Sequence, residues 1–303
     1  MDTVSRLLSR AQLEATLEKH CLLGAGTRMD VAGYGELEVP FHVLLEGECR
    51  LHVGRQVFEL RPGDVVLIPS GAEHRVVTAG PGERGTVETG GEAFVTTRSE
   101  RGGDPVIDLF CGHFTVNAGT GALLFRSLPG AVHVSFGRSA ETDEVLRGLS
   151  FLMRAEAGRE GSGTAAILSA LCTVLLAMVL RTARGTATAD VLWTAVTDPG
   201  IASAVAGVLD DPGADWTIER LSRQVAMSRA TFLRRFVRET GTTAGAFLTR
   251  ARMMAAAQLL STSDATVASV AGRVGYQSES AFSRAFRAEL GTTPARFRRD
   301  RRR

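Results

Sequence analysis

The sequence predicts an α+β protein of two domains, an N-terminal β-barrel followed by an all-α domain with two similar helical units. Up to residue 137, short apolar runs are separated by Gly and Pro, which is typical of strands in a barrel or sandwich. From Glu141 the apolar spacing changes to the helical period. The charge divides as well: residues 213–303 hold 17 Arg, no Lys and 7 acidic residues, a balance of +10, which leaves −8 for the rest of a chain of net charge +2.

The N-terminal strands are predicted from partly alternating apolar runs. Residues 41–53 (FHVLLEGECRLHV) and 56–60 (QVFEL) precede the turn RPGD and the run VVLIP. Residues 79–105 are rich in Gly and charge, which predicts a long loop, although EAFVTTR within it has the composition of a short strand.

Two helices are expected next, over residues 141–158 and 164–183, with REGSG between them and the linker RGTATAD after them. Residues 164–180 are uncharged and must be weighed as a membrane span. They fall short of the roughly 20 residues that a bilayer requires, and they include Thr, Ser and Cys. We therefore predict a buried helix or a dimer seam, formed by Leu168, Leu171, Leu175, Met178 and Val179.

The C-terminal domain shows one local pattern twice. In residues 216–241 and again in residues 267–291, a short apolar helix leads through a tight turn to a Ser that can cap a second helix, Ser228 or Ser278. Each second helix has two Phe at i and i+4 directed to the core, and an Arg on the opposite face, Arg234 or Arg284. This is the plan of a helix-turn-helix that enters a DNA major groove.

The spacing between the units agrees with that interpretation. Residues 242–261 predict one helix of about 18 residues, or ~27 Å, which is suited to holding two recognition helices about one DNA turn apart. The basic charge favours a polyanionic partner for this domain alone, and the alternative is a solvated surface that is rich in Arg.

The C-terminal third resembles the DNA-binding domain of AraC/XylS-type transcriptional regulators. The residues that carry the resemblance are WTIERLS, MSRATFLRRFVRETG, AAAQLL and VASVAGRVGYQSESAFSRAFRAELGTTPARFRR. The chain departs from the family at Ala244, where Pro is frequent, and Ala230 and Leu233 offer no hydrogen bonds to a base. The resemblance implies DNA contacts by Arg229, Ala230, Leu233 and Arg234 in the first unit, and by Glu279, Ser280, Ser283, Arg284 and Arg287 in the second.

The N-terminal region resembles the cupin domain of AraC-type regulators. Residues 63–74 (GDVVLIPSGAEH) fit the second cupin motif up to His74, and FHVLLEGECRLHVG, LFCGHFTV and GALLFRSLPGAVHV are similar to its strands. A catalytic cupin also presents His-x-His and Glu, but only His42 stands in the corresponding region. His42 and His74, joined by Cys111 or His113, could bind zinc; the alternative is that both are hydrogen-bonded barrel residues.

The four cysteines show no CxxC spacing, which argues against a disulfide framework or a zinc finger. Cys21 follows Lys19 and His20, whose positive charge would favour the reactive thiolate. Cys21 is therefore a candidate redox sensor with Cys111 or Cys49 as its partner, and the alternative is a small half-buried residue.

We predict a cupin-like sensor domain over residues 1–137, a helical linker and dimerisation segment over 138–190, and a DNA-binding domain over 191–303. The expected protein is a non-enzymatic, cytoplasmic, homodimeric transcriptional regulator that binds double-stranded promoter DNA. If it activates transcription, it also contacts RNA polymerase. Its signal would be an oxidant or a small organic ligand in the barrel. The alternative is a metal-dependent cupin oxygenase or isomerase fused to a DNA-binding module.

Overall fold

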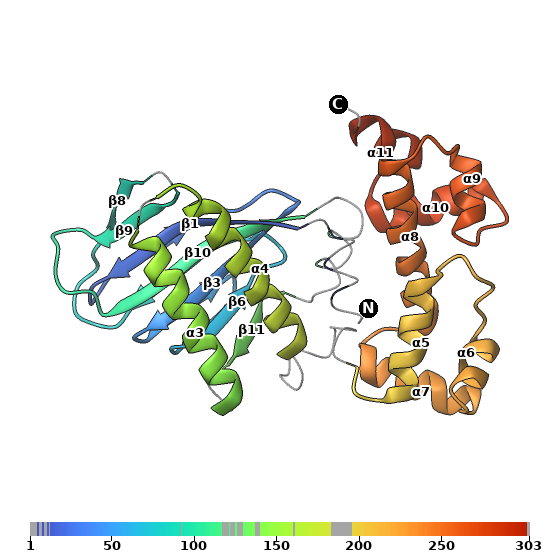
Figure 1. Ribbon diagram of the computed structural model, residues 1–303, viewed down its shortest axis with the longest axis horizontal. Helices are drawn as coiled ribbons and strands as arrows, with labels where there is room; N and C mark the ends of the chain where they lie inside the picture. Colours follow the sequence, from blue (N-terminus) through green and yellow to red (C-terminus); the bar gives the residue numbers. More distant parts are fainter. Residues whose placement is uncertain are drawn as a thin grey trace. The chain divides into compact units, whose positions relative to one another are not determined.

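The structure, a computed structural model, describes residues 13–91, 93–116, 130–136, 140–159, 161–182 and 196–301, together with residues 5, 8, 11, 121 and 125 (Figure 1). Two compact units are present, and each is described on its own. One contains the strands and the next two helices, and the other contains the C-terminal helices. The predicted linker at residues 184–190 lies outside the described residues.

The strands of the N-terminal unit form two sheets. Their bounds are β1 Glu14–Leu23, β2 Arg28–Val31, β3 Glu38–Glu46, β4 Cys49–Val53, β5 Gln56–Leu60, β6 Asp64–Leu67, β7 His74–Thr78, β8 Thr86–Gly90, β9 Val95–Ser99, β10 Ile107–Thr115 and β11 Val132–Ser135. The order is β11-β6-β3-β10-β1-β9-β8 in the larger sheet and β2-β7-β4-β5 in the smaller. The expected barrel is thus present as two separate sheets rather than as one closed sheet.

The core of this unit lies between the two sheets. Leu44 and Leu109 come from the larger sheet and Leu51 and Val76 from the smaller, and all four belong to one buried apolar cluster. Strand β3 is buried from Val39 to Leu45 without alternation, because a central strand is covered on both faces.

The predicted loop at residues 79–105 contains more structure than its composition indicates. The short strand expected from EAFVTTR is present as β9, which runs parallel to β1. Strand β8 pairs with β9 and was not predicted, since its exposed residues give no apolar signal.

Helices α3 (Ala140–Ala157) and α4 (Thr164–Thr182) lie across one face of the larger sheet (Figure 1). In the described part of the chain, residues 164–181 are the one segment long and apolar enough to cross a membrane, and 44% of that segment is buried in the protein. Its buried face packs against β1.

Of the two interpretations of residues 164–180, the buried helix is confirmed for most of the named residues, and the dimer seam through those same residues is wrong. Leu168, Leu175, Met178 and Val179 are each at most 5% exposed, because they fill the core beside the sheet. Leu171 is half-buried. The exposed side of α4 carries other residues, among them Ile167 and Val174.

The C-terminal unit is entirely helical. Its elements are α5 Pro199–Asp210, α6 Ile218–Gln224, α7 Arg229–Thr240, α8 Ala244–Thr262, α9 Val267–Arg273, α10 Glu279–Leu290 and α11 Pro294–Arg301. The long helix α8 has α6 and α7 toward one end and α9 and α10 toward the other (Figure 1). Both predicted helix-turn-helix units are confirmed.

Candidate nucleic-acid interface and sensor core

Helices α7 and α10 are built and held in the same way. Ser228 and Ser278 accept hydrogen bonds from the backbone N–H three residues on, which satisfies a donor that the helix itself leaves free. Each helix is anchored by a buried Phe pair, with ring centroids 5.5 Å apart in α7 and 5.6 Å apart in α10. These anchors fix which side of each helix faces outward.

The residues expected to contact DNA lie away from these anchors. They are exposed, apart from the half-buried Leu233 and Ser283, and form an outer face on each helix: Arg229, Ala230, Leu233 and Arg234 on α7, and Glu279, Ser280, Ser283, Arg284 and Arg287 on α10. The structure therefore places all nine where a ligand can reach them.

The arginines of these faces differ in their partners. Arg229 Nη1 lies 3.2 Å from Glu219 Oε1, so its charge is partly compensated. Within the described residues, Arg234, Arg284 and Arg287 make neither an ion pair nor a side-chain hydrogen bond. Their donors are available for phosphate oxygens or for guanine O6 and N7.

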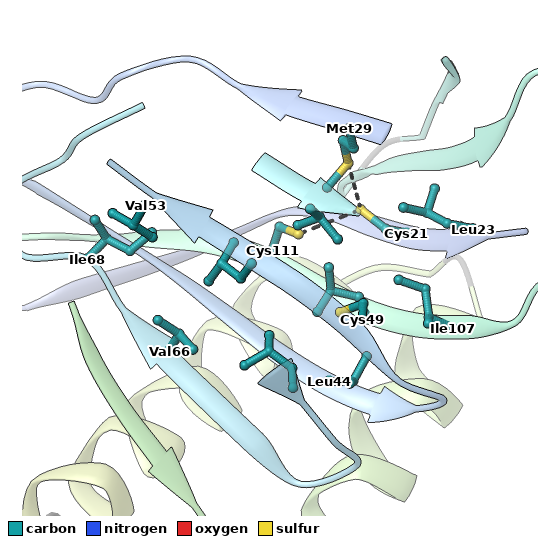
Figure 2. Packing of buried hydrophobic residues seen from close by; sticks show 14 of the residues in the cluster. Cys21, Leu23, Met29, Leu44, Cys49, Val53, Val66, Ile68, Ile107 and Cys111 are labelled. Carbon is teal, nitrogen blue, oxygen red and sulfur yellow. Dashed lines mark hydrogen bonds between the residues drawn. The ribbon is translucent and has the colours of Figure 1, made fainter. Parts of the chain in front are cut away.

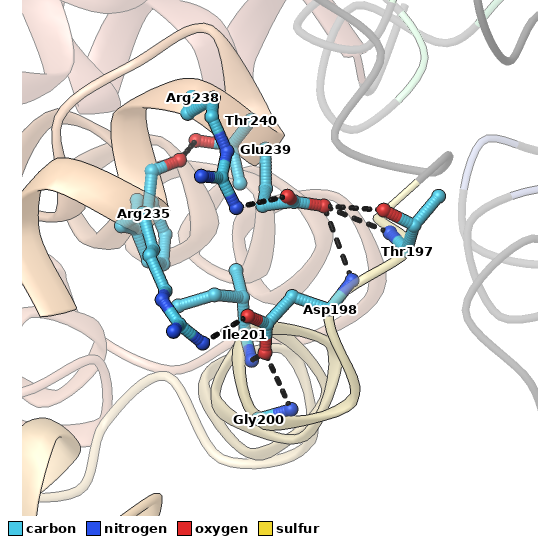
Figure 3. Close-up of polar contacts among 9 residues, drawn as sticks. Thr197, Asp198, Gly200, Ile201, Arg235, Arg238, Glu239 and Thr240 are labelled. Atoms are coloured by element: carbon cyan, nitrogen blue, oxygen red, sulfur yellow. Dashed lines mark hydrogen bonds and ion pairs between the residues drawn. The ribbon is translucent and has the colours of Figure 1, made fainter. Parts of the chain in front are cut away.

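The first unit is tied to the residues that lead into α5 (Figure 3). Glu239 Oε2 accepts hydrogen bonds from the backbone N–H groups of Thr197 and Asp198 and from the Thr197 hydroxyl, at 3.0, 3.1 and 2.8 Å. Asp198 in turn caps α5 and accepts from Arg235 Nη1 at 2.9 Å. Burial would raise the pKa of Glu239, but the hydrogen bonds from Thr197 and Asp198 outweigh it and lower the pKa to about 2.

The two units differ at the turn before the recognition helix. Gly275 has φ +79°, in the left-handed region that suits glycine. The corresponding turn of the first unit has Ala226 at φ +52°, where a Cβ introduces strain.

In the N-terminal unit, the candidate redox residues are brought together. Cys21 on β1 and Cys111 on β10 have their Sγ atoms 3.6 Å apart, and Met29 Sδ lies 3.7 Å from Cys21 (Figure 2). Cys21 is fully buried and Cys111 is 3% exposed. Of the two partners considered for Cys21, Cys111 is in contact with it; Cys49 lies in the same core cluster without such a contact.

The charges that were expected to activate Cys21 are already engaged. Lys19 Nζ lies 2.5 Å from Glu88, and His20 Nε2 lies 2.9 Å from Asp108. Both charges are thus shared with a carboxylate, although Lys19 still interacts electrostatically with Cys21 and Cys111.

A different base lies beside Cys111. His74 Nδ1 is 2.8 Å from the carbonyl oxygen of Ala72, which can only accept, so Nδ1 holds the proton. Burial lowers the pKa of both His74 and His42, and a neutral His74 then accepts at Nε2 from His42 Nε2–H, 2.7 Å away. His42 Nδ1 is left without a proton and accepts from the Cys111 thiol at 3.1 Å. The sequence grouped His42 and His74 with Cys111 or His113 as possible zinc ligands, with hydrogen-bonded barrel residues as the alternative. It did not predict the order of the hydrogen bonds, because the members of the chain are 32 and 69 positions apart.

The arrangement does not fit a cupin metal centre. Among the described residues, no group of three or more His, Cys, Asp or Glu side chains is placed to hold a metal ion. His42 and His74 direct their Nε2 atoms at each other, and His113 lies apart from them, with its Nδ1 3.2 Å from Glu18.

A pocket of about 490 Å³ lies between the first residues of β1 and the first turns of α4. It is lined by residues 14–17, 165–166 and 168–170 together with Ala93, so it lies outside the core between the sheets. The sequence expected a small organic ligand inside the barrel, whereas this pocket lies at the contact between sheet and helix.

Comparisons with known proteins cover both units. A family model described as cupin matches residues 2–184, and a second, described as helix-turn-helix domain, matches residues 221–300. The chain is 30% identical to the RCS-specific HTH-type transcriptional activator RclR of Escherichia coli K12, over 98% of this chain and 97% of that protein. It is 32% identical to a putative AraC-like transcription regulator of Streptomyces lividans, with the same coverage. The DNA-binding domain of AdpA, solved in complex with a target DNA, is 39% identical over 34% of this chain and 93% of that chain, with a TM-score of 0.33.

Proposed function

The chain belongs to the AraC-type helix-turn-helix transcriptional regulators with an N-terminal cupin domain, and we propose that it reads promoter DNA through the outer faces of α7 and α10. The observation that carries this proposal is the pair of matched helices whose exposed arginines, Arg234, Arg284 and Arg287, have no side-chain partner within the described part of the domain. Such a protein acts where promoter DNA is, which for this chain we expect to be the cytoplasm. If it activates transcription, RNA polymerase is its further partner.

The test is operator binding by single-arginine variants. An operator is first selected from random duplex DNA with the full-length protein. Arg234→Ala and Arg284→Ala are each expected to lose about 1–3 kcal/mol of affinity, or roughly 5–150-fold. Arg55→Ala is the matched control, because Arg55 is also exposed but lies in the β4–β5 turn. Unchanged affinity in both recognition-helix variants would contradict the proposal.

The proposal further predicts a steep dependence on salt. A domain of charge +10 releases counterions from several phosphates when it binds. The slope of log affinity against log salt should become shallower by about one for each variant that removes a phosphate contact.

For the signal, we propose oxidation of the Cys21–Cys111 pair by a small hydroperoxide-class oxidant. As Cys111 Sγ attacks the peroxide oxygen, the thiol proton moves through His42 Nδ1 to the departing oxygen, so that a sulfenic acid forms and an alcohol or water leaves without a free thiolate. The Cys21 thiol then attacks the Cys111 sulfur, so that a disulfide forms and water leaves. The burial of both sulfurs restricts the oxidant to a small molecule.

The disulfide requires the strands to move, and this provides a route for the signal. Cys21 pairs with Leu109, so Cys111 is its diagonal neighbour, at a Cα separation of about 7–8 Å for such pairs. Disulfides span about 4.4–6.8 Å, so closing the bond pulls β1 against β10. Since α4 packs on β1, that displacement reaches the helix directly.

The test of the signal uses three cysteine variants. The wild-type protein should lose two hydrogens by mass on treatment with peroxide, with the linkage mapped between Cys21 and Cys111. Cys21→Ser and Cys111→Ser should lose that linkage and the transcriptional response, whereas Cys49→Ser, which removes a buried thiol of the same cluster, should retain both. A full response in Cys21→Ser would leave a small-molecule inducer as the signal.

We also propose that the protein is a homodimer through the exposed sides of α3 and α4. Val145 and Leu152 on α3, and Ile167 and Val174 on α4, are pairs seven residues apart and 46–54% exposed. Phe151 beside them is 70% exposed. Repeats of seven along two neighbouring helices are the pattern by which helices of two chains pack together.

A further inference from the structure

The two helix-turn-helix units touch each other away from the helix that connects them. The loop from α5 to α6 belongs to the first unit and reaches the turn after α9 in the second (Figure 1). A Cβ on Gly213 would lie 2.0 Å from the carbonyl oxygen of Arg273, and a Cβ on Gly275 would lie 2.8 Å from the carbonyl oxygen of Gly213. The backbones of the units therefore approach as closely as only glycine allows.

One side chain holds this contact together. Arg252 on α8 donates from Nε to the carbonyl of Pro212 at 3.0 Å and from Nη2 to the carbonyl of Ala214 at 3.2 Å. Its guanidinium carbon lies 5.7 Å from the centroid of the Tyr276 ring in the second unit. Arg252 thus binds two carbonyls of the first unit and stacks on the turn of the second at the same time.

The geometry gives this contact a mechanical role. Helix α8 connects the units along one axis, and its 19 residues extend over about 28 Å. A single connecting helix fixes the distance between the two units well, but it resists bending and rotation of one unit relative to the other less well. A second connection beside the axis, between Gly213 and Gly275, restricts both motions.

We propose that Gly213, Arg252 and Tyr276 form an inter-unit lock that sets the angle and spacing of α7 relative to α10, so that the protein selects operators by the number of base pairs between their two boxes. Arg252 is a positioning residue and does not itself contact bases. One inserted base pair moves a box by about 3.4 Å and rotates it by about 35° around the duplex. A locked pair of helices cannot follow that change, and a freely hinged pair can. This inference rests on the proposed reading of DNA by both helices.

The test compares three duplexes derived from the selected operator: the original, one with a base pair inserted between the boxes, and one with a base pair deleted. A fourth duplex carries only the box that is read by α10. For the wild-type protein, either change of spacing should weaken binding by about tenfold or more. Arg252→Met keeps the aliphatic stem but removes the guanidinium. In this variant, a change of spacing should weaken binding by only about twofold to threefold. Its affinity for the single-box duplex should stay within about twofold of wild type.

Arg250→Met is the matched control, because Arg250 lies on the same helix and its one ion pair within the described residues is long, 3.7 Å from Glu289. It should retain the full spacing penalty. Gly213→Ala is a second variant, in which the added Cβ must push the units apart, and it should change which spacing binds best. Thermal unfolding of each variant reports whether the domain is folded.

The outcomes separate the lock from the underlying function. If the wild-type protein binds no selected DNA, the proposed function fails. If the wild-type protein binds but tolerates both spacing changes, the lock is refuted. The lock is also refuted if the folded Arg252→Met and Gly213→Ala variants both keep the wild-type spacing penalty and preferred spacing. In either case the proposal that both helices read DNA stands.

Discussion

Two neighbouring residues of α4 allow the fold and the assembly of the protein to be perturbed separately. Leu175 is 1% exposed and packs inside its own unit, whereas Val174, about 100° away around the helix axis, is 49% exposed. Placing Arg at either position adds the same charge to the same helix. The consequences should differ, because one site is in the core and the other is on the proposed dimer face.

The magnitudes follow from burial. Leu175→Arg loses the burial of a leucine, about 1.5–3 kcal/mol, and leaves an unpaired charge in the core at a further cost of about 3–5 kcal/mol. That total is comparable with the whole stability of a domain, about 5–15 kcal/mol, so the N-terminal unit should unfold or become marginal. Val174→Arg should change the stability of the fold by no more than about 0.5 kcal/mol but place an unpaired charge in the dimer interface.

The assays are thermal unfolding followed by circular dichroism and sedimentation velocity at equal protein concentrations. Val174→Arg should be folded and monomeric, Leu175→Arg should melt far below wild type, and Val57→Arg, an exposed valine on β5, should remain a folded dimer. A dimeric Val174→Arg refutes the proposed face. A folded, stable monomer from Leu175→Arg would restore the seam that the sequence predicted and refute the assignment of Leu175 to the core.

Two further predictions concern the DNA-binding domain. Ala226→Gly relieves a left-handed backbone and should raise the free energy of unfolding by about 1 kcal/mol, measured by urea denaturation; an unchanged or lower value would show that the turn is unstrained. The second prediction concerns pH. Glu239 has a pKa of about 2 in the folded domain, below its ordinary value of 4.5. The ionised carboxylate therefore contributes its full share to the free energy of unfolding above pH 4.5, and that contribution is lost as the pH falls toward 2. Glu239→Gln should therefore be less stable than wild type at pH 7, and the difference should shrink with acidification; a pH-independent difference would rule out the carboxylate as its cause.

The helix-turn-helix units could be predicted because each is specified by local spacing. A capping Ser, two Phe four positions apart and an outward Arg all lie within nine residues of one another, so the period of the helix alone assigns their directions. The same holds for the turn at Gly275. Each of these signals was confirmed where the sequence placed it.

The contacts between distant segments could not be decided in this way. The sequence named Cys111 or Cys49 as the partner of Cys21 but could not choose between them, because the contact depends on the register of β1 and β10, and a shift of one residue would direct either thiol to the other face. Arg252 and Glu239 act on carbonyl and N–H groups about 40 positions away, and backbone groups have no signature in a sequence.

Helix α4 shows why the sequence predicted the dimer seam on the wrong side. An amphipathic helix reveals its buried face by contrast with polar residues on the other face, but residues 164–180 are uncharged on every side. Apolar stripes can be drawn through Leu168 and Leu175 or through Ile167 and Val174 with the same seven-residue spacing. The shape of the sheet surface, and not the helix itself, decides which stripe meets β1. Leu168 and Leu175 fill that surface and are therefore in the core. Ile167 and Val174 remain exposed and available to a partner. A helix that is apolar all round and only half covered by its own chain still has a face to bury, and this favours a second copy of the protein over solvent at Ile167 and Val174.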